Sequence, residues 1–119
     1  MTAINLFHIL EEMTARALQQ LDLLTLLALM RLGDAAYGLA VAREIEDAGR
    51  VVPLASLYAV LARLEDAGLV TSELGSPTPE RGGRAKRYFR VTAKGVREVR
   101  DARRTLTRLW ARLPALDIF

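Results

Sequence analysis

The chain of 119 residues has no cysteine and only one histidine, His8. The lack of cysteine excludes disulfide bonds, thiol catalysis and zinc or iron–sulfur sites with cysteine ligands. One histidine cannot form a multi-histidine metal cage, and we expect His8 to be a surface or interface residue. Only seven residues are aromatic, which argues against an aromatic surface that stacks RNA bases. The sequence therefore predicts no metal and no other cofactor.

Long apolar runs and catalytic motifs are also missing. The most apolar run, Leu23 to Met30, is too short to cross a membrane, and the N-terminus lacks the basic region of a signal peptide. There is no Ser-His-Asp set, and Gly82-Gly83-Arg84 precedes a predicted strand rather than a helix, unlike a phosphate-binding loop. We therefore expect a cytoplasmic protein that is neither an enzyme nor a membrane protein.

The charge is divided unevenly along the chain. Residues 1–80 contain five basic and eleven acidic residues, a net charge of −6, whereas residues 81–119 contain twelve basic and three acidic residues, a net charge of +9. Such asymmetry is typical of a polyanion partner, either nucleic acid or a membrane surface. A basic helix face that is merely solvated is the alternative.

Apolar spacing predicts three helices in the first half of the chain. Across almost all of residues 3–32, apolar residues recur at the three- and four-residue spacing of a helix. A second helix is predicted over 36–48, with a buried face that comprises Tyr37, Val41, Ile45 and Ala48. A third helix starts near Pro53, with Leu54, Leu57, Leu61 and Leu64 as its buried stripe. Glycines at 33, 49 and 68 are predicted to end the three helices.

The second half changes pattern. Residues 69–74 and 85–91 are predicted strands, and the intervening segment, rich in glycine and proline, is a loop. Thr92 is a predicted N-cap for a last helix that runs from Ala93 to about Leu113. The order of elements predicts a mostly helical α+β fold, a winged helix-turn-helix with a two-stranded wing. We expect an N-terminal helical segment (1–17) that takes part in dimerisation, a DNA-binding domain (18–92) and a C-terminal dimerisation helix (93–119).

Five segments together resemble the PadR family of transcriptional regulators. They are Tyr37-Gly38, Leu57-Tyr58 with Leu61 and Arg63-Leu64-Glu65, Gly68-Leu69-Val70, Gly82 to Tyr88, and Val91 to Gly95. The resemblance covers roughly residues 18–110 and is to the shorter subfamily, which has a single C-terminal helix for dimerisation. It implies a regulator, in most cases a repressor, that can respond to phenolic or other hydrophobic compounds.

Two positions depart from the family pattern. Pro53 stands where a serine or similar cap is common, and Ala55 stands where glycine is common. Pro53 removes a side-chain cap, and Ala55 adds a methyl group where the backbone could approach DNA. These differences bear on how the third helix docks, not on the fold.

The third helix is the predicted recognition helix, which would lie in the major groove. Ser56 and Tyr58 are candidates for base or phosphate contacts, and the resemblance implies a DNA-side role for Tyr58. Packing of the Tyr58 ring on the wing is the alternative. Arg63 is a candidate for a backbone contact, or for an exposed ion pair with Glu65, Asp66 or Asp47.

The wing carries further candidates for DNA contacts, namely Arg84, Lys86 and Arg87. Arg84 at its tip suits a phosphate or a narrow minor groove, which attracts arginine. We expect Phe89 and Val91 to face the core. A loop whose basic residues only improve solubility is the alternative.

The last helix has an apolar stripe without an obvious place on so small a core. Its members, Val96, Val99, Leu106, Leu109, Trp110 and Leu113, predict a seam with a second copy of the chain. Packing on the chain's own N-terminal helix is the alternative, and both can hold together. Trp110 is also a candidate site for a planar effector between the subunits, although interface packing alone would explain it.

The sequence therefore predicts a homodimeric, sequence-specific regulator of double-stranded DNA, a repressor at a pseudo-palindromic operator. A winged-helix module that binds proteins rather than DNA is the alternative. Unlike a DNA-binding regulator, such a module would have little salt-dependent affinity for duplex DNA.

Overall fold

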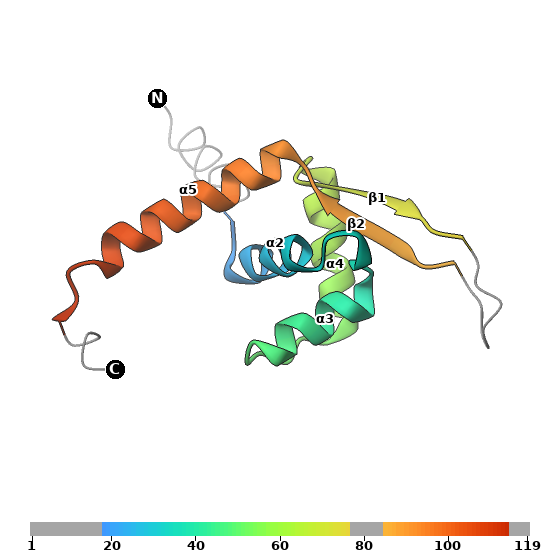
Figure 1. The fold of residues 1–119 in the computed structure, drawn as a ribbon, viewed down its shortest axis with the longest axis horizontal. Coiled ribbons are helices and arrows are strands. Elements are labelled where there is room, and N and C mark those ends of the chain that lie inside the picture. Colours follow the sequence, from blue (N-terminus) through green and yellow to red (C-terminus); the bar gives the residue numbers. More distant parts are fainter. Residues whose placement is uncertain (1–17, 77–84, 115–119) are drawn as a thin grey trace, which may run out of the picture.

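The computed structural model describes residues 18–76 and 85–114. Three helices are followed by a two-stranded sheet and a last long helix (Figure 1). The elements are α2 (Gln20–Leu32), the short 3-10 helix η1 (Gly33–Ala35), α3 (Gly38–Asp47), α4 (Leu54–Asp66), β1 (Val70–Leu74), β2 (Arg87–Val91) and α5 (Ala93–Trp110). The predicted helical segment 3–17 lies outside the described residues.

Glycines end the first three helical segments, as predicted. Gly33, Gly49 and Gly68 all have positive φ angles, of 57°, 112° and 77°. This backbone region is strained for residues with a side chain and open to glycine. The chain can therefore reverse direction within a few residues after α2, α3 and α4.

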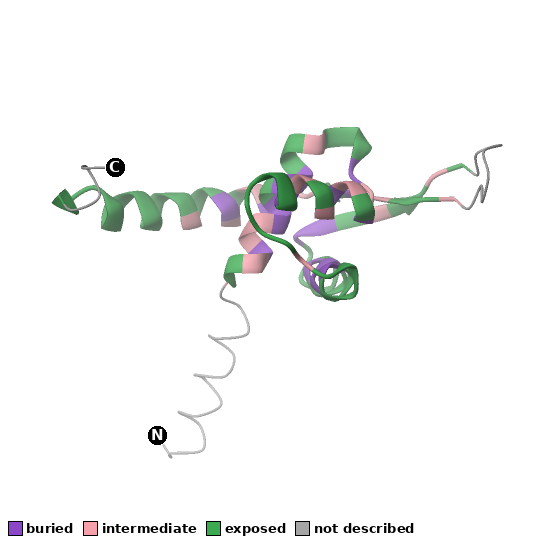
Figure 2. Ribbon diagram, turned by 90° about the horizontal axis from the view of Figure 1, so that it is seen from below, coloured by how far each residue is buried: buried purple, intermediate pink, exposed green. Residues whose placement is uncertain are grey.

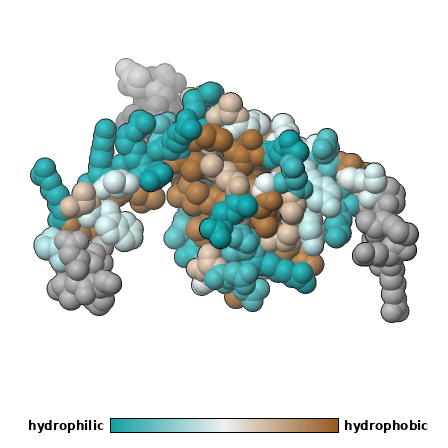
Figure 3. Space-filling model, viewed as in Figure 1, coloured by the Kyte–Doolittle hydropathy of each residue, from teal (hydrophilic) through white to brown (hydrophobic). Residues whose placement is uncertain are grey.

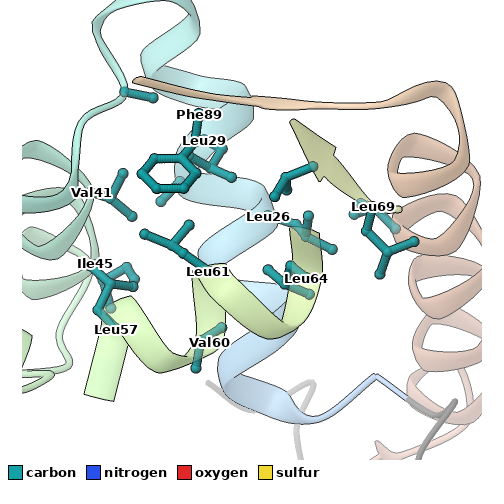
Figure 4. Close-up of a cluster of buried hydrophobic side chains, with 14 residues drawn as sticks. Leu26, Leu29, Val41, Ile45, Leu57, Val60, Leu61, Leu64, Leu69 and Phe89 are labelled. Atoms are coloured by element: carbon teal, nitrogen blue, oxygen red, sulfur yellow. The ribbon is translucent and has the colours of Figure 1, made fainter. Parts of the chain in front are cut away.

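The hydrophobic core lies where α2, α3, α4 and β2 meet (Figure 4). Leu26 of α2, Val41 of α3 and Leu61 of α4 are completely buried, and Phe89 of β2 covers them with 5% exposure. Burial of each such side chain stabilises the fold by about 1.5–3 kcal/mol. The core thus holds the inner faces of α3 and α4 and the base of the wing in one unit.

Two details of α3 differ from the prediction. Tyr37 is not on the helix but precedes it, with an extended backbone (φ −107°, ψ 163°), and its carbonyl accepts a hydrogen bond from Val41 N at 3.0 Å. Ala48 is exposed rather than buried. The prediction for Tyr37 is wrong because its backbone pairs with the sheet, a tertiary contact that helical spacing does not reveal.

The buried stripe of α4 is also shifted from the predicted one. Leu57, Leu61 and Leu64 are buried as predicted, but Leu54 is 40% exposed and Val60 is buried at 4% exposure. Leu54 is the first residue of the helix and does not belong to the buried core, whereas Val60 does.

The sheet is antiparallel, with Val70 opposite Val91 and Leu74 opposite Arg87. A third short segment joins its other edge, because Phe89 N donates to Ala36 O at 2.9 Å and Tyr37 forms a bridge with Tyr88. The wing is thereby attached to the turn between α2 and α3. A two-stranded hairpin alone is barely stable in water, so this attachment stabilises the wing.

The last helix begins as predicted and ends three residues earlier. The Thr92 hydroxyl accepts a hydrogen bond from Gly95 N at 3.1 Å, which caps the helix. The helix ends at Trp110 rather than Leu113, because Pro114 disfavours a helical backbone at the residue before it. Figure 2 shows α5 extending away from the other elements, exposed along most of its outer half.

Candidate nucleic-acid interface

Three polar side chains of α4 lie on either side of its buried stripe. Ser56 and Arg63 are exposed on one flank, and Tyr58, two residues after Ser56 and so across the helix from it, is 47% exposed on the other. Between the two flanks, Leu57 and Leu61 are completely buried and fix the helix to the core. The sequence therefore places polar side chains on a helix that the core holds rigidly, as a recognition helix requires.

Tyr58 lies against the start of α3. A methyl group added at Gly38 would stand 2.6 Å from Tyr58 Cζ, so the ring occupies the space that a side chain at this position would take. This contact explains the glycine of the Tyr37-Gly38 pair. The ring orientation of Tyr58 depends on Gly38, which the sequence alone did not indicate.

Arg63 forms an ion pair with Asp22, a residue of α2 that is only 4% exposed. The Asp22 carboxylate also accepts a hydrogen bond from Gln19 N at 3.0 Å, within the capping box of α2. None of Glu65, Asp66 and Asp47, the partners considered from the sequence, forms this pair. The Arg63 side chain is 48% exposed, and its contact with DNA stays a prediction.

An aromatic cluster at the base of the wing joins it to α3. The rings of Tyr37 and Tyr88 meet edge to face with centroids 5.9 Å apart, and Lys86 Nζ lies 4.2 Å from the centroid of the Tyr37 ring. Such a cation–π contact is worth about 0.5–1 kcal/mol at an exposed site. The Lys86 side chain is exposed and held beside the start of α3.

Two arginines of β2 contact other elements. Arg87 Nη1 donates to Ser72 Oγ at 3.1 Å, and Ser72 Oγ donates to Glu65 Oε2 at 2.6 Å, which connects the wing with the end of α4. Arg90 pairs with Asp34 of η1 at 2.6 Å. Arg84 lies outside the described residues, so its position at the tip of the wing stays a prediction.

The predicted dimer residues of α5 divide into two groups. Val99 is 6% exposed and belongs to the core of its own chain, and Val96 is half-buried. By contrast, Leu106, Leu109, Trp110 and Leu113 are 47%, 70%, 62% and 45% exposed. Packing on the chain's own α2 therefore accounts for the first part of the stripe and leaves the second part without a partner within the described residues.

An apolar groove of about 550 Å³ runs between α2 and α5. Leu23 and Leu27 line one side, and Leu106 and Trp110 line the other. This volume is within the range of small-molecule sites. Trp110, the residue predicted to contact an effector, therefore lines this groove.

Within the ranges 18–76 and 85–114, no group of three His, Asp or Glu side chains is arranged to hold a metal ion. In the same part of the chain, no helix is both long and apolar enough to cross a membrane.

The arrangement of three helices, an attached two-stranded wing and an outward-facing α4 defines a winged helix-turn-helix protein of the DNA-binding class. The chain belongs to the transcriptional regulator PadR-like family, whose family model matches residues 26–101. It is therefore a transcriptional regulator, as the resemblance in the sequence implied.

Solved structures agree with this assignment. A PadR family transcriptional regulator from Eggerthella lenta is 28% identical, with 92% of each chain covered and a TM-score of 0.61. A PadR family transcription regulator from Clostridium difficile R20291 has the same fold at 18% identity, with 85% of this chain and 100% of that chain covered and a TM-score of 0.65. Among the curated proteins, none matches the chain.

Proposed function

We propose that this PadR-like regulator is a homodimeric repressor that binds double-stranded DNA at a pseudo-palindromic operator. The observation that carries the proposal is the continuity of α4 with the wing. Tyr58 of α4 contacts Gly38, and Lys86 lies over the ring of the neighbouring Tyr37. Recognition helix and wing thus form one surface, which can follow a groove and the adjacent phosphates together.

The residues of this surface have different tasks. Ser56 and Tyr58 carry hydroxyl groups that can bond to base edges or phosphates in the major groove. Arg84, Lys86 and Arg87 supply positive charge for phosphates, and Arg63 lies nearer the end of α4, over the backbone. Repression follows from steric exclusion of the polymerase by the bound protein.

Dimerisation uses the exposed apolar residues in the outer half of α5. Four large apolar side chains in the last turns and just beyond them, Leu106, Leu109, Trp110 and Leu113, are 45–70% exposed. A second copy would cover them in a seam of the coiled-coil type. Two recognition helices held in this way would reach successive major grooves, about 34 Å apart.

The groove beside Trp110 is the proposed site for a planar hydrophobic effector. The dimer seam sets the spacing of the two recognition helices, and DNA affinity depends on that spacing. A ligand in the groove would therefore change DNA affinity only as far as it binds one spacing more tightly than another. Titration of planar aromatic compounds against the fluorescence of Trp110, the single tryptophan, tests this site. Saturable quenching together with weaker DNA binding supports it, and absence of quenching across a broad panel contradicts it.

Salt dependence of duplex binding tests the DNA proposal itself. Each phosphate contact contributes about 0.9 to the slope of log K against log salt concentration. Arg84→Ala with Lys86→Ala is expected to weaken binding to every duplex and to reduce the slope by about 1.8 per subunit, which is about 3.6 for the dimer, at about 0.9 per contact. The matched control, Arg43→Ala with Arg50→Ala, removes the same charge elsewhere. Unchanged binding in the wing variant would contradict the proposal, and absence of salt-dependent binding in the wild type would favour the protein-interaction module.

A further inference from the structure

A row of arginines on α5 is not used by the proposed DNA surface. Arg97, Arg100, Arg104 and Arg108 follow one another at spacings of three and four residues, and all four are exposed. We call these four residues the α5 basic face. They extend over about 16 Å of helix, at about 1.5 Å per residue.

This basic face lies on the side of α5 that the dimer seam leaves free. Arg104 and Arg108 stand two residues before and after Leu106, and at 3.6 residues per turn this places them across the helix from it. If Leu106 and Trp110 are covered by a second copy, the arginines still face solvent. The inference therefore rests on the dimer of the proposed function.

Few carboxylates neutralise these charges. Among the described residues, Arg104 is the one member with an ion pair, to Asp101 at 3.6 Å, and both side chains are more than 60% exposed. Such exposed pairs contribute about 0–1 kcal/mol and are easily exchanged. A row of exposed arginines creates a positive potential that attracts a linear polyanion.

The position of α5 determines whether DNA bound to α4 and the wing can also contact the α5 basic face. In Figure 1, α2 lies between α5 and α3, and the wing extends from the core in the opposite direction to α5. In Figure 3, hydrophilic side chains project from α5 on the side away from the core. A straight duplex bound to α4 and the wing would not contact this side.

We propose that the α5 basic face binds the phosphate backbone of a second DNA duplex, so that the dimer joins two DNA segments. Duplex DNA carries one negative charge per about 1.7 Å of its axis, so a stretch of duplex as long as the α5 basic face, about 16 Å, offers several phosphates to the four arginines. The contact involves no base edges and is independent of sequence. Each subunit contributes one such face.

Capture of a second duplex by protein bound to a first one tests this directly. A duplex selected from a random library for tight binding is fixed to beads and saturated with dimer, and a labelled 40-base-pair duplex of unrelated sequence is added. The wild type is expected to retain the second duplex, with retention falling steeply as salt rises. In Arg97→Gln/Arg100→Gln/Arg108→Gln, affinity for the second duplex should fall about tenfold or more and the salt slope by about 2.7, at about 0.9 per contact.

The matched control keeps the charge. Arg97→Lys/Arg100→Lys/Arg108→Lys should retain the second duplex nearly as the wild type does, and both triple variants should bind the first duplex within twofold of the wild type. Two results overturn the inference and leave the proposed function intact. In the first, the glutamine variant captures the second duplex as well as the wild type does. In the second, the wild type binds the first duplex and captures no second one. Binding to phosphatidylserine vesicles in place of the second duplex also overturns it. A wild type that binds no duplex at all contradicts the proposed function as well.

Discussion

Arg63 of α4 is paired with Asp22, a buried carboxylate at the start of α2. The same carboxylate closes the capping box of α2 through Gln19 N. One side chain therefore fixes the first turn of α2 and the second half of α4 to each other. The orientation of α4 in the fold therefore depends on a buried residue of α2.

Replacement of Asp22 by alanine should destabilise the protein by about 1–3 kcal/mol, because it removes an N-terminal cap and leaves Arg63 unpaired. Chemical denaturation measures the change. Asp34→Ala is the matched control, since the Asp34–Arg90 pair is largely exposed, and it should cost less than about 1 kcal/mol. Equal effects of the two substitutions would show that Asp22 has no special role.

Gly38→Ala should weaken DNA binding with little loss of stability. The added methyl group would displace the Tyr58 ring, whose Cζ is 2.6 Å from its position, and the half-exposed ring can rotate outward. We expect a change in stability within about 1 kcal/mol, because the alanine also favours the helix. Fluorescence anisotropy with the selected duplex gives the affinity.

The double variant Gly38→Ala/Tyr58→Ala shows whether the ring carries this effect. If it does, Gly38→Ala should change DNA affinity in the wild type and have little effect in the Tyr58→Ala background, since coupled residues are not additive. Additive losses would contradict a role for this contact.

Gly95→Ala should destabilise the junction of the wing and α5. An added methyl group would contact the carbonyl oxygen of Leu69 and stand 2.6 Å from Val91 Cγ1, and backbone atoms cannot move aside as the Tyr58 ring can. We expect a cost of about 1–3 kcal/mol, as for other overpacked sites. Thr105→Ala, at an exposed position of the same helix, should change stability by less than about 0.5 kcal/mol.

Leu106→Glu should convert the dimer into a folded monomer, because Leu106 is 47% exposed in the single chain and its replacement leaves the core intact. Light scattering should give twice 13.2 kDa for the wild type and half of that mass for the variant. Thr105→Glu adds the same charge off the apolar stripe and should remain dimeric. A wild type that is monomeric at tens of micromolar would contradict the proposed seam.

Local signals predicted much of the fold. Glycines that end helices, the stripe of Leu57, Leu61 and Leu64, and the Thr92 cap each depend on neighbours within a few residues, which the sequence displays directly. The order of these elements was enough to indicate the winged helix-turn-helix fold and its family.

Contacts between distant residues could not be predicted in the same way. Asp22 and Arg63 are separated by 41 residues, and from the sequence each of the three acidic residues Glu65, Asp66 and Asp47 was an equally good partner for Arg63. The extended backbone of Tyr37 likewise depends on its pairing with Tyr88. Helical spacing could assign Val99 to a stripe, but only the packing of α5 on α2 shows that its own chain buries it.

The composition of the complex with a selected duplex tests the central proposal most directly. Selection from a random library, followed by native mass measurement of the protein bound to the enriched duplex, gives the site and the stoichiometry together. We expect two chains of 13.2 kDa on an inverted repeat whose half-site centres are about 10–10.5 base pairs apart, or a multiple of this spacing. One chain on an asymmetric site, or no enrichment of any sequence, would contradict it.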